Sequence, residues 1–148
     1  MKKLFIICIL ALSCITLDAQ VKCNGGLFLK MTHKATVARG SAVMVDFMLT
    51  NRTQGDIDIS FKKESSKIMD NTGTTYSGNN VTFDFANTGL DYGMIPGGCS
   101  VKFRCIVTGL DENASSIPLM MINYRCSLSD SDEWTLFVRK VKLFSMQE

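Results

Sequence analysis

The sequence predicts an all-β protein: an antiparallel β-sandwich of seven to eight strands that follows an N-terminal signal peptide. Two observations carry this prediction. Short runs of alternating apolar and polar residues recur along the 148-residue chain, and this is the period of half-buried strands. Gly, Asn, Asp and Pro separate the runs, and no segment after residue 19 keeps a helical period over three turns.

The first residues have the organisation of a secretory signal. Lys2 and Lys3 precede an apolar run, and small residues follow that run. The run is shorter than the roughly 20 apolar residues that a membrane-spanning helix needs. We therefore expect cleavage after Ala19, which gives a signal peptide at 1–19 and a single domain at 20–148.

Export and net charge limit where the protein is expected and which partners it can have. The domain is expected outside the cytoplasm, in the periplasm or secreted, with no transmembrane segment after the signal is removed. Cleavage before Cys14 is the alternative, and lipid attachment there would give a lipid-anchored subunit of an envelope complex. The chain carries a net charge of +2, and loss of the signal, with two lysines and one aspartate, lowers it to +1. That balance leaves no electrostatic footprint for nucleic acid.

The stretch 41–61 contains two alternating runs around a polar segment. The apolar positions share odd numbers: Val43, Val45, Phe47, Leu49, Ile57, Ile59 and Phe61. The segment 50–56 between the runs is rich in turn residues. We expect a hairpin, or two neighbouring strands of one fold.

Further runs predict the remaining strands. These lie near 26–31, 81–85, 101–107, 120–126 and 134–143. In the last run the apolar positions change parity between Val138 and Val141. A β-bulge near Arg139–Lys140 would explain that change.

Several motifs resemble a family of exported bacterial immunoglobulin-like domains of unknown function. "VMVDFMLTN…DIDISF" is similar to two successive strands of that family, and "KIMDNTGTTY" and "VKFRCIVTGLDENASSI" continue the resemblance. It covers residues 41–126. The resemblance implies an immunoglobulin-like sandwich, secreted or attached to the envelope, and it supplies no catalytic residues. The "YRC" motif at 124–126 does not make this an antibody domain, because Trp134 follows the cysteine instead of preceding it.

Four cysteines remain after residue 19, and export permits disulfides. If strands at 99–108 and 117–126 pair with each other, Cys99 lies level with Cys126. We therefore expect a Cys99–Cys126 disulfide, with Cys23 as the competing partner for either. Cys105 is expected as a buried small side chain. A redox site is the alternative, but no C-x-x-C pair is present to lower a thiol pKa.

Catalytic and metal-binding constellations are sparse. His33 is the only histidine, so we expect no catalytic triad, no metal site and no cofactor. Met44 and Met48 are expected in the core or, if they point outward, as an apolar stripe for a partner. A metal-handling or hydrolytic protein whose site forms only on folding is the alternative.

Two Gly-rich loops carry the candidate binding residues. Tyr76 lies in the loop 64–80 and Tyr92 in the loop 87–98, and tyrosine among Gly, Asn and Ser is adaptable recognition chemistry. The sequence thus predicts a non-catalytic binding or structural module with an unidentified protein or glycan partner at the cell envelope. Strand addition at an open sheet edge, within a larger assembly, is a further alternative.

Overall fold

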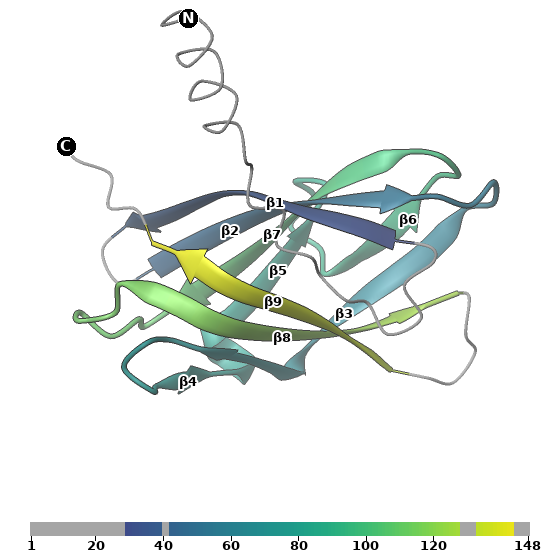
Figure 1. Cartoon of the computed structure of the whole chain (residues 1–148). Helices are drawn as coiled ribbons and strands as arrows, with labels where there is room; N and C mark the ends of the chain where they lie inside the picture. Colours follow the sequence, from purple (N-terminus) through teal and green to yellow (C-terminus); the bar gives the residue numbers. More distant parts are fainter. Residues whose placement is uncertain (1–28, 40–41, 128–132, 144–148) are drawn as a thin grey trace, which may run out of the picture.

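The structure, a computed structural model, describes residues 29–39, 42–127 and 133–143, and these form two antiparallel sheets packed face to face (Figure 1). The expected signal peptide, Cys14 and Cys23 lie outside the described residues. One sheet has the strand order β1-β2-β7-β5, and the other has the order β4-β3-β8-β9, with β6 also paired to β3. In the part of the chain that the structure describes, no helix is long and apolar enough to cross a membrane.

The elements have the following bounds. The first sheet contains β1 (Leu29–Arg39), β2 (Ala42–Asn51), β7 (Ser100–Thr108) and β5 (Val81–Phe85). The second contains β4 (Thr75–Tyr76), β3 (Ile57–Met69), β8 (Ser116–Cys126), β9 (Trp134–Lys142) and β6 (Tyr92–Ile95). A short 3-10 helix, η1 (Gly78–Asn80), precedes β5.

The predicted alternation builds the core between the two sheets. Val43, Val45, Phe47 and Leu49 of β2 are all buried, whereas the residues between them are only half-buried. At the centre, the Phe61 ring of β3 stacks on the Phe103 ring of β7, with 3.9 Å between their centroids. Each such fully buried apolar side chain stabilises the fold by about 1.5–3 kcal/mol. The all-β sandwich that the sequence predicts is therefore present.

The connection between β2 and β3 is a crossing from one sheet to the other, so the expected hairpin is wrong. β2 pairs with β1 and β7, whereas β3 pairs with β4, β6 and β8. The buried side chain of Asn51 holds the crossing. Its Nδ2 donates to the carbonyl oxygens of Gly55 (2.7 Å) and Ile95 (3.0 Å), and its Oδ1 accepts from the Thr53 amide (2.9 Å). Because these backbone groups find partners, the chain can turn between sheets at little cost.

The neighbour order is that of a constant-type immunoglobulin sandwich. The sheet β1-β2-β7-β5 faces the sheet β3-β8-β9, as strands ABED face CFG in that fold. β4 and β6 are additions on the remaining edge of β3. The described residues thus form nine strands, where the sequence predicts seven to eight. β4 has two residues and β6 has four, which is too short for alternation to reveal them.

β3 continues well beyond the run seen in the sequence because it contains a wide bulge. The register with β8 shifts between Lys62 and Lys67. Inside the bulge, the buried Ser66 hydroxyl donates to the Lys62 carbonyl (2.6 Å) and accepts from the Asn123 amide (2.9 Å). These bonds replace the interrupted ladder, so β3 resumes pairing and extends to Met69.

The predicted parity change in β9 is present, but its cause differs from the expected bulge. Val138 and Val141 are both buried, yet the register between β8 and β9 runs without a shift. Lys140 adopts φ +58°, in the left-handed region, and lies opposite Pro118. Pro118 has no N–H to offer the ladder, so the two strands can change faces together at this position.

Candidate functional site

A groove of about 540 Å³ lies on the outer face of the second sheet, over β3 and between β6 and β8. The cross-strand register explains its lining. Ser60 pairs with Tyr92 on one side and with Arg125 on the other, and Asp58 pairs with Met94. Directly paired residues of neighbouring strands point to the same face. The outward residues of β3 alone would make this surface polar. The registers add the aromatic ring of Tyr92, the thioether of Met94 and the guanidinium of Arg125 to it.

A tight turn delivers the chain from β5 to β6. Ala86 and Asn87 both have positive φ, and the Thr88 amide donates to the Phe85 carbonyl (3.0 Å), which describes a type I′ turn. The Phe85 amide then donates to the Leu90 carbonyl (2.8 Å). The chain leaves one sheet here and joins the edge of the other.

Glycine at position 93 lets β6 lie flat on the core. A Cβ at Gly93 would overlap the ring of Phe85, so the inward side of β6 has room only for hydrogen. At the end of the strand, a Cβ at Gly97 would overlap the backbone of Gln54. With its inward side closed in this way, β6 presents Tyr92 and Met94 to solvent.

Tyr92 and Met94 are among the few large apolar side chains that the described residues expose. Their exposed fractions are 54% and 51%. Arg125 and Asp58 are also exposed, and neither forms an ion pair within the described residues. The groove therefore combines an aromatic ring and a flexible apolar arm with polar groups that are free to contact a ligand.

Tyr76, the other candidate from the sequence, is a structural residue. It is only 4% exposed, its hydroxyl donates to Asp70 Oδ2 (2.7 Å), and the same oxygen accepts from the Asp111 amide (2.8 Å). Asp70 Oδ1 accepts from the amides of Thr72 (2.8 Å) and Thr74 (3.0 Å). These hydrogen bonds tie the 70–76 turn to the 109–116 loop. The aromatic face of Tyr76 is therefore not available to a ligand.

These contacts shift two pKa values. Burial alone would raise the pKa of Asp70, but hydrogen bonds from Thr72, Tyr76 and Thr74 outweigh it and hold the pKa below the ordinary 3.8. Burial, together with the hydrogen bond to the Asp70 carboxylate, raises the pKa of Tyr76. The pair is therefore an ionised carboxylate and a neutral phenol at neutral pH, which is a structural arrangement.

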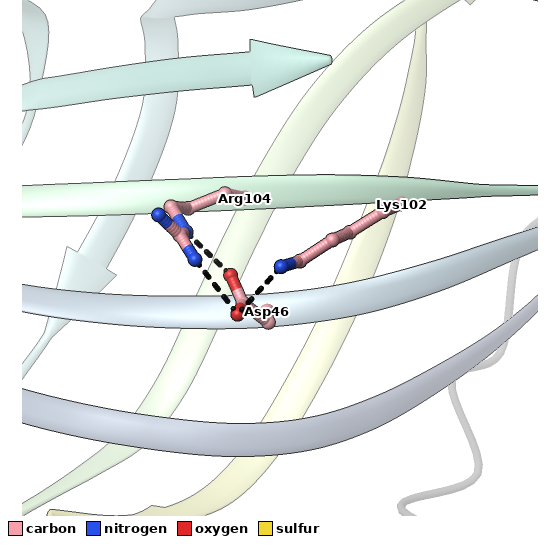
Figure 2. A network of polar contacts seen from close by, with 3 residues as sticks. All are labelled: Asp46, Lys102 and Arg104. Atoms are coloured by element: carbon pink, nitrogen blue, oxygen red, sulfur yellow. Dashed lines mark hydrogen bonds and ion pairs between the residues drawn. The ribbon is translucent and has the colours of Figure 1, made fainter. Parts of the chain in front are cut away.

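The outer face of the first sheet carries a different polar group, shown in Figure 2. Asp46 of β2 accepts from Arg104 of β7 through Nε (2.6 Å) and Nη2 (3.0 Å), and Lys102 Nζ lies 3.4 Å from the same carboxylate. The hydrogen bond from Arg104 lowers the pKa of Asp46, and the bond to Asp46 raises the pKa of Arg104. Since Asp46 and Arg104 are directly paired in the ladder, this network cross-links two strands.

The cysteines do not pair as expected in the structure. Within the described residues, Cys99, Cys105 and Cys126 form no disulfide. The expected Cys99–Cys126 disulfide rested on β7 pairing with β8, but these strands belong to different sheets. Burial strongly raises the pKa of the Cys105 thiol, as suits a core side chain. Cys126 is half-buried and pairs with the buried Ile59, so its side chain packs against the core although the residue also borders the groove. Whether Cys23 pairs with Cys99 or Cys126 stays a prediction.

The other candidates from the sequence have the following places. His33 lies in β1, next to a register shift between His33 and Ala35. Met44 and Met48 are at the outward positions of β2, where both are half-buried. Within 29–39, 42–127 and 133–143, no three side chains of His, Cys, Asp or Glu come together as a metal site.

Sequence comparisons give no match, and solved structures match over the fold at low identity. No protein-family model and no curated protein matches this chain. A family 123 glycoside hydrolase from Clostridium perfringens, which hydrolyses glycolipid glycans, matches 74% of this chain with 8% identity and a TM-score of 0.49, and this chain spans 22% of that enzyme. The cupredoxin domain of amoB from Nitrosocaldus yellowstonii matches 82% of this chain and 89% of that domain (13% identity, TM-score 0.47). The ASH/PapD-like domain 7 of human CEP192 matches 81% of this chain and 86% of that domain (11% identity, TM-score 0.45).

Proposed function

We propose that this chain is an exported, non-catalytic binding module whose ligand occupies the groove on the outer face of β6, β3 and β8. One observation carries the proposal. Tyr92 and Met94 are both about half exposed, and they line a groove of about 540 Å³ instead of standing singly on the surface. Exposed apolar groups gathered at one place on a soluble surface are a mark of an interaction site.

The lining suits a ligand with both apolar and hydrogen-bonding groups. The Tyr92 ring offers a stacking face and a hydroxyl, and the Met94 side chain can adapt its shape to a partner. Arg125 supplies donors and Asp58 supplies acceptors at the same surface. An envelope glycan or an exposed protein segment carries the complementary groups, so these two classes are the partners that we propose.

Binding can be tested with a glycan array and with a library of synthetic peptides as the probes. We expect the wild-type protein to retain members of one class, and Tyr92→Ala and Arg125→Ala to lose at least about tenfold in affinity, which corresponds to about 1.4 kcal/mol. Met69→Ala is the matched control, because Met69 is an exposed apolar residue of the same sheet outside the groove. Equal losses in Met69→Ala and Tyr92→Ala, or unchanged binding in Tyr92→Ala, would refute the assignment of the site.

Export is a separate part of the proposal and has its own test. Intact mass spectrometry of the protein from its natural host, with and without reduction, gives the first residue and the state of the cysteines. A chain that starts at Gln20 supports a secreted or periplasmic module. A chain that starts at a lipidated Cys14 indicates a module tethered to a membrane, and a chain that keeps Met1 contradicts export.

A further inference from the structure

The main chain of β6 has an open side, and the pairing with β3 shows which groups face it. The Phe61 amide donates to the Asp91 carbonyl (2.8 Å), so positions 91, 93 and 95 direct their main-chain groups toward β3. The N–H and C=O groups of Tyr92 and Met94 then point away from β3. None of the described residues hydrogen-bonds to them. The same two residues carry the exposed side chains of the groove.

The edges formed by β9, β1 and β5 have features that oppose pairing with a further strand. β9 exposes Arg139, Lys140 and Lys142, and Lys140 also bends the strand through its positive φ. β1 contains a register shift, and the Phe85 amide at the end of β5 is already bound to Leu90. Charges and bulges of this kind are how proteins protect sheet edges. β6 has the sequence Tyr-Gly-Met-Ile and carries no charge.

We propose that two copies of this chain associate by pairing β6 with β6, antiparallel, with Gly93 at the two-fold axis. In this register Tyr92 lies opposite Met94 of the partner subunit, and Met94 lies opposite Tyr92 of the partner subunit. Each such pair exchanges both main-chain hydrogen bonds, because all of these groups face the open side. An aromatic side chain meets a thioether in both pairs, which is a favourable contact. No like charges meet, whereas self-pairing of β9 would bring its cations together.

The pairing would also extend the groove. Met94 of the partner subunit would stand beside the Tyr92 ring at the edge of the lining, and the two outer faces would form one continuous surface. This inference rests on the main-chain groups of β6 and not on the proposed ligand, so either can fail without the other. Only the three residues from Tyr92 to Met94 pair in each copy, so we expect a weak dimer, with a Kd on the order of 100 µM.

Sedimentation equilibrium between about 10 µM and about 1 mM tests the association. We expect the mass to rise with concentration toward two chains. Met94→Pro removes the outward N–H and leaves the pairing with β3 intact, so it should raise the Kd at least about tenfold. Met94→Ala is the matched control: it keeps the N–H, shortens the side chain and should have the smaller effect. A monomer at every concentration, or a dimer equally stable in Met94→Pro, would overturn the proposal.

Disulfide trapping tests the register and does not depend on proline being tolerated. A mixture of Tyr92→Cys and Met94→Cys proteins should form a cross-link between positions 92 and 94, identified by mass spectrometry. Each variant alone should give far less dimer through its new cysteine, because like positions lie on opposite sides of the two-fold axis. Cross-linking that is equal in the mixture and in the single variants would contradict the antiparallel register centred on Gly93.

Discussion

The turn at 70–76 and the segment at 90–95 are built from similar residues, yet the tyrosine of the first is buried and the tyrosine of the second faces solvent. Both lie along the same edge of β3, and each places a tyrosine beside that strand. Tyr76 pairs with Ile68, which points into the core, whereas Tyr92 pairs with Ser60, which points outward. The parity of pairing with β3 therefore decides which tyrosine becomes structural and which can meet a ligand.

The turn at 70–76 also shows what burial of a tyrosine requires. Its hydroxyl must find partners inside the fold, and Asp70 and the Asp111 amide supply them. Tyr92 has no such requirement because its hydroxyl stays in solvent. The two regions should respond in opposite ways to mutation, with the first controlling stability and the second controlling recognition.

Removal of the Asp70 carboxylate should have the largest effect on stability. Asp70→Ala leaves the Thr72 and Thr74 amides and the buried Tyr76 hydroxyl without the buried carboxylate that accepts from them. We expect the free energy of unfolding to fall by about 3 kcal/mol or more, measured by urea denaturation. The control is Asp58→Ala, in the exposed groove, which should stay within about 0.5 kcal/mol of wild type. A loss below about 1 kcal/mol in Asp70→Ala would contradict the structural role of the turn.

Loss of the Tyr76 hydroxyl should have the next largest effect. Tyr76→Phe keeps the buried ring but removes the acceptor of the Asp111 amide and one donor to Asp70. We expect the protein to lose about 1–2 kcal/mol of stability, seen as a lower urea midpoint at an unchanged slope. The double variant Asp70→Ala/Tyr76→Phe completes a cycle. If the two losses simply add, the side chains do not act as one unit.

Alternation in the sequence predicts most of the sandwich because it reports burial directly. The inward residues of β2 and the parity change between Val138 and Val141 both follow from it. Alternation carries no information on which strands are neighbours, and this is why the 50–56 segment looks like a hairpin. The signal for the crossing was Asn51, whose buried amide holds the loop, but a polar residue in a turn looks the same whether it is buried or exposed.

The candidate site was predictable only in part. Loop composition singles out Tyr76 and Tyr92 equally, because both stand among Gly, Asn and Thr. The distinction depends on registers with β3, and β4 and β6 are too short to show an alternating pattern. Arg125 and Asp58 were not candidates from the sequence, because only the same registers with β3 place them in the groove. The spacing of Asp70, Thr72 and Tyr76 was the available hint, since an Asx turn with Thr two residues on often anchors a loop.

Acid should weaken the 70–76 turn and leave β6 unaffected. The pKa of Asp70 is lowered in the folded state, so the carboxylate contributes its full stability above the unfolded value of 3.8. That contribution is lost as the pH falls below 3.8 and through the lowered folded pKa. Asp46 also contributes stability that is lost in acid, because its pKa is lowered in the folded state too.

The measurement is urea denaturation between pH 7 and pH 2 for three proteins. Asp70→Asn should be less stable than wild type at pH 7 and should show a shallower decline in acid. Asp46→Asn should still show the part of the acid-induced loss of stability that comes from Asp70. Identical pH profiles for wild type and Asp70→Asn would show that the turn does not depend on an ionised carboxylate.

Substitution of Tyr92 should change stability least. The ring is more than half exposed, and its outward position leaves the contacts of Gly93 with Phe85 unchanged. We expect Tyr92→Ser to alter the free energy of unfolding by less than about 0.5 kcal/mol, in contrast to Tyr76→Ser, which exposes a core position and should lose about 3 kcal/mol or more. Thermal and urea denaturation of the two variants side by side provide the measurement. If Tyr92→Ser were as destabilising as Tyr76→Ser, the Tyr92 ring would be part of the packing of the fold. That result would contradict the proposal that the groove is an open surface for a ligand.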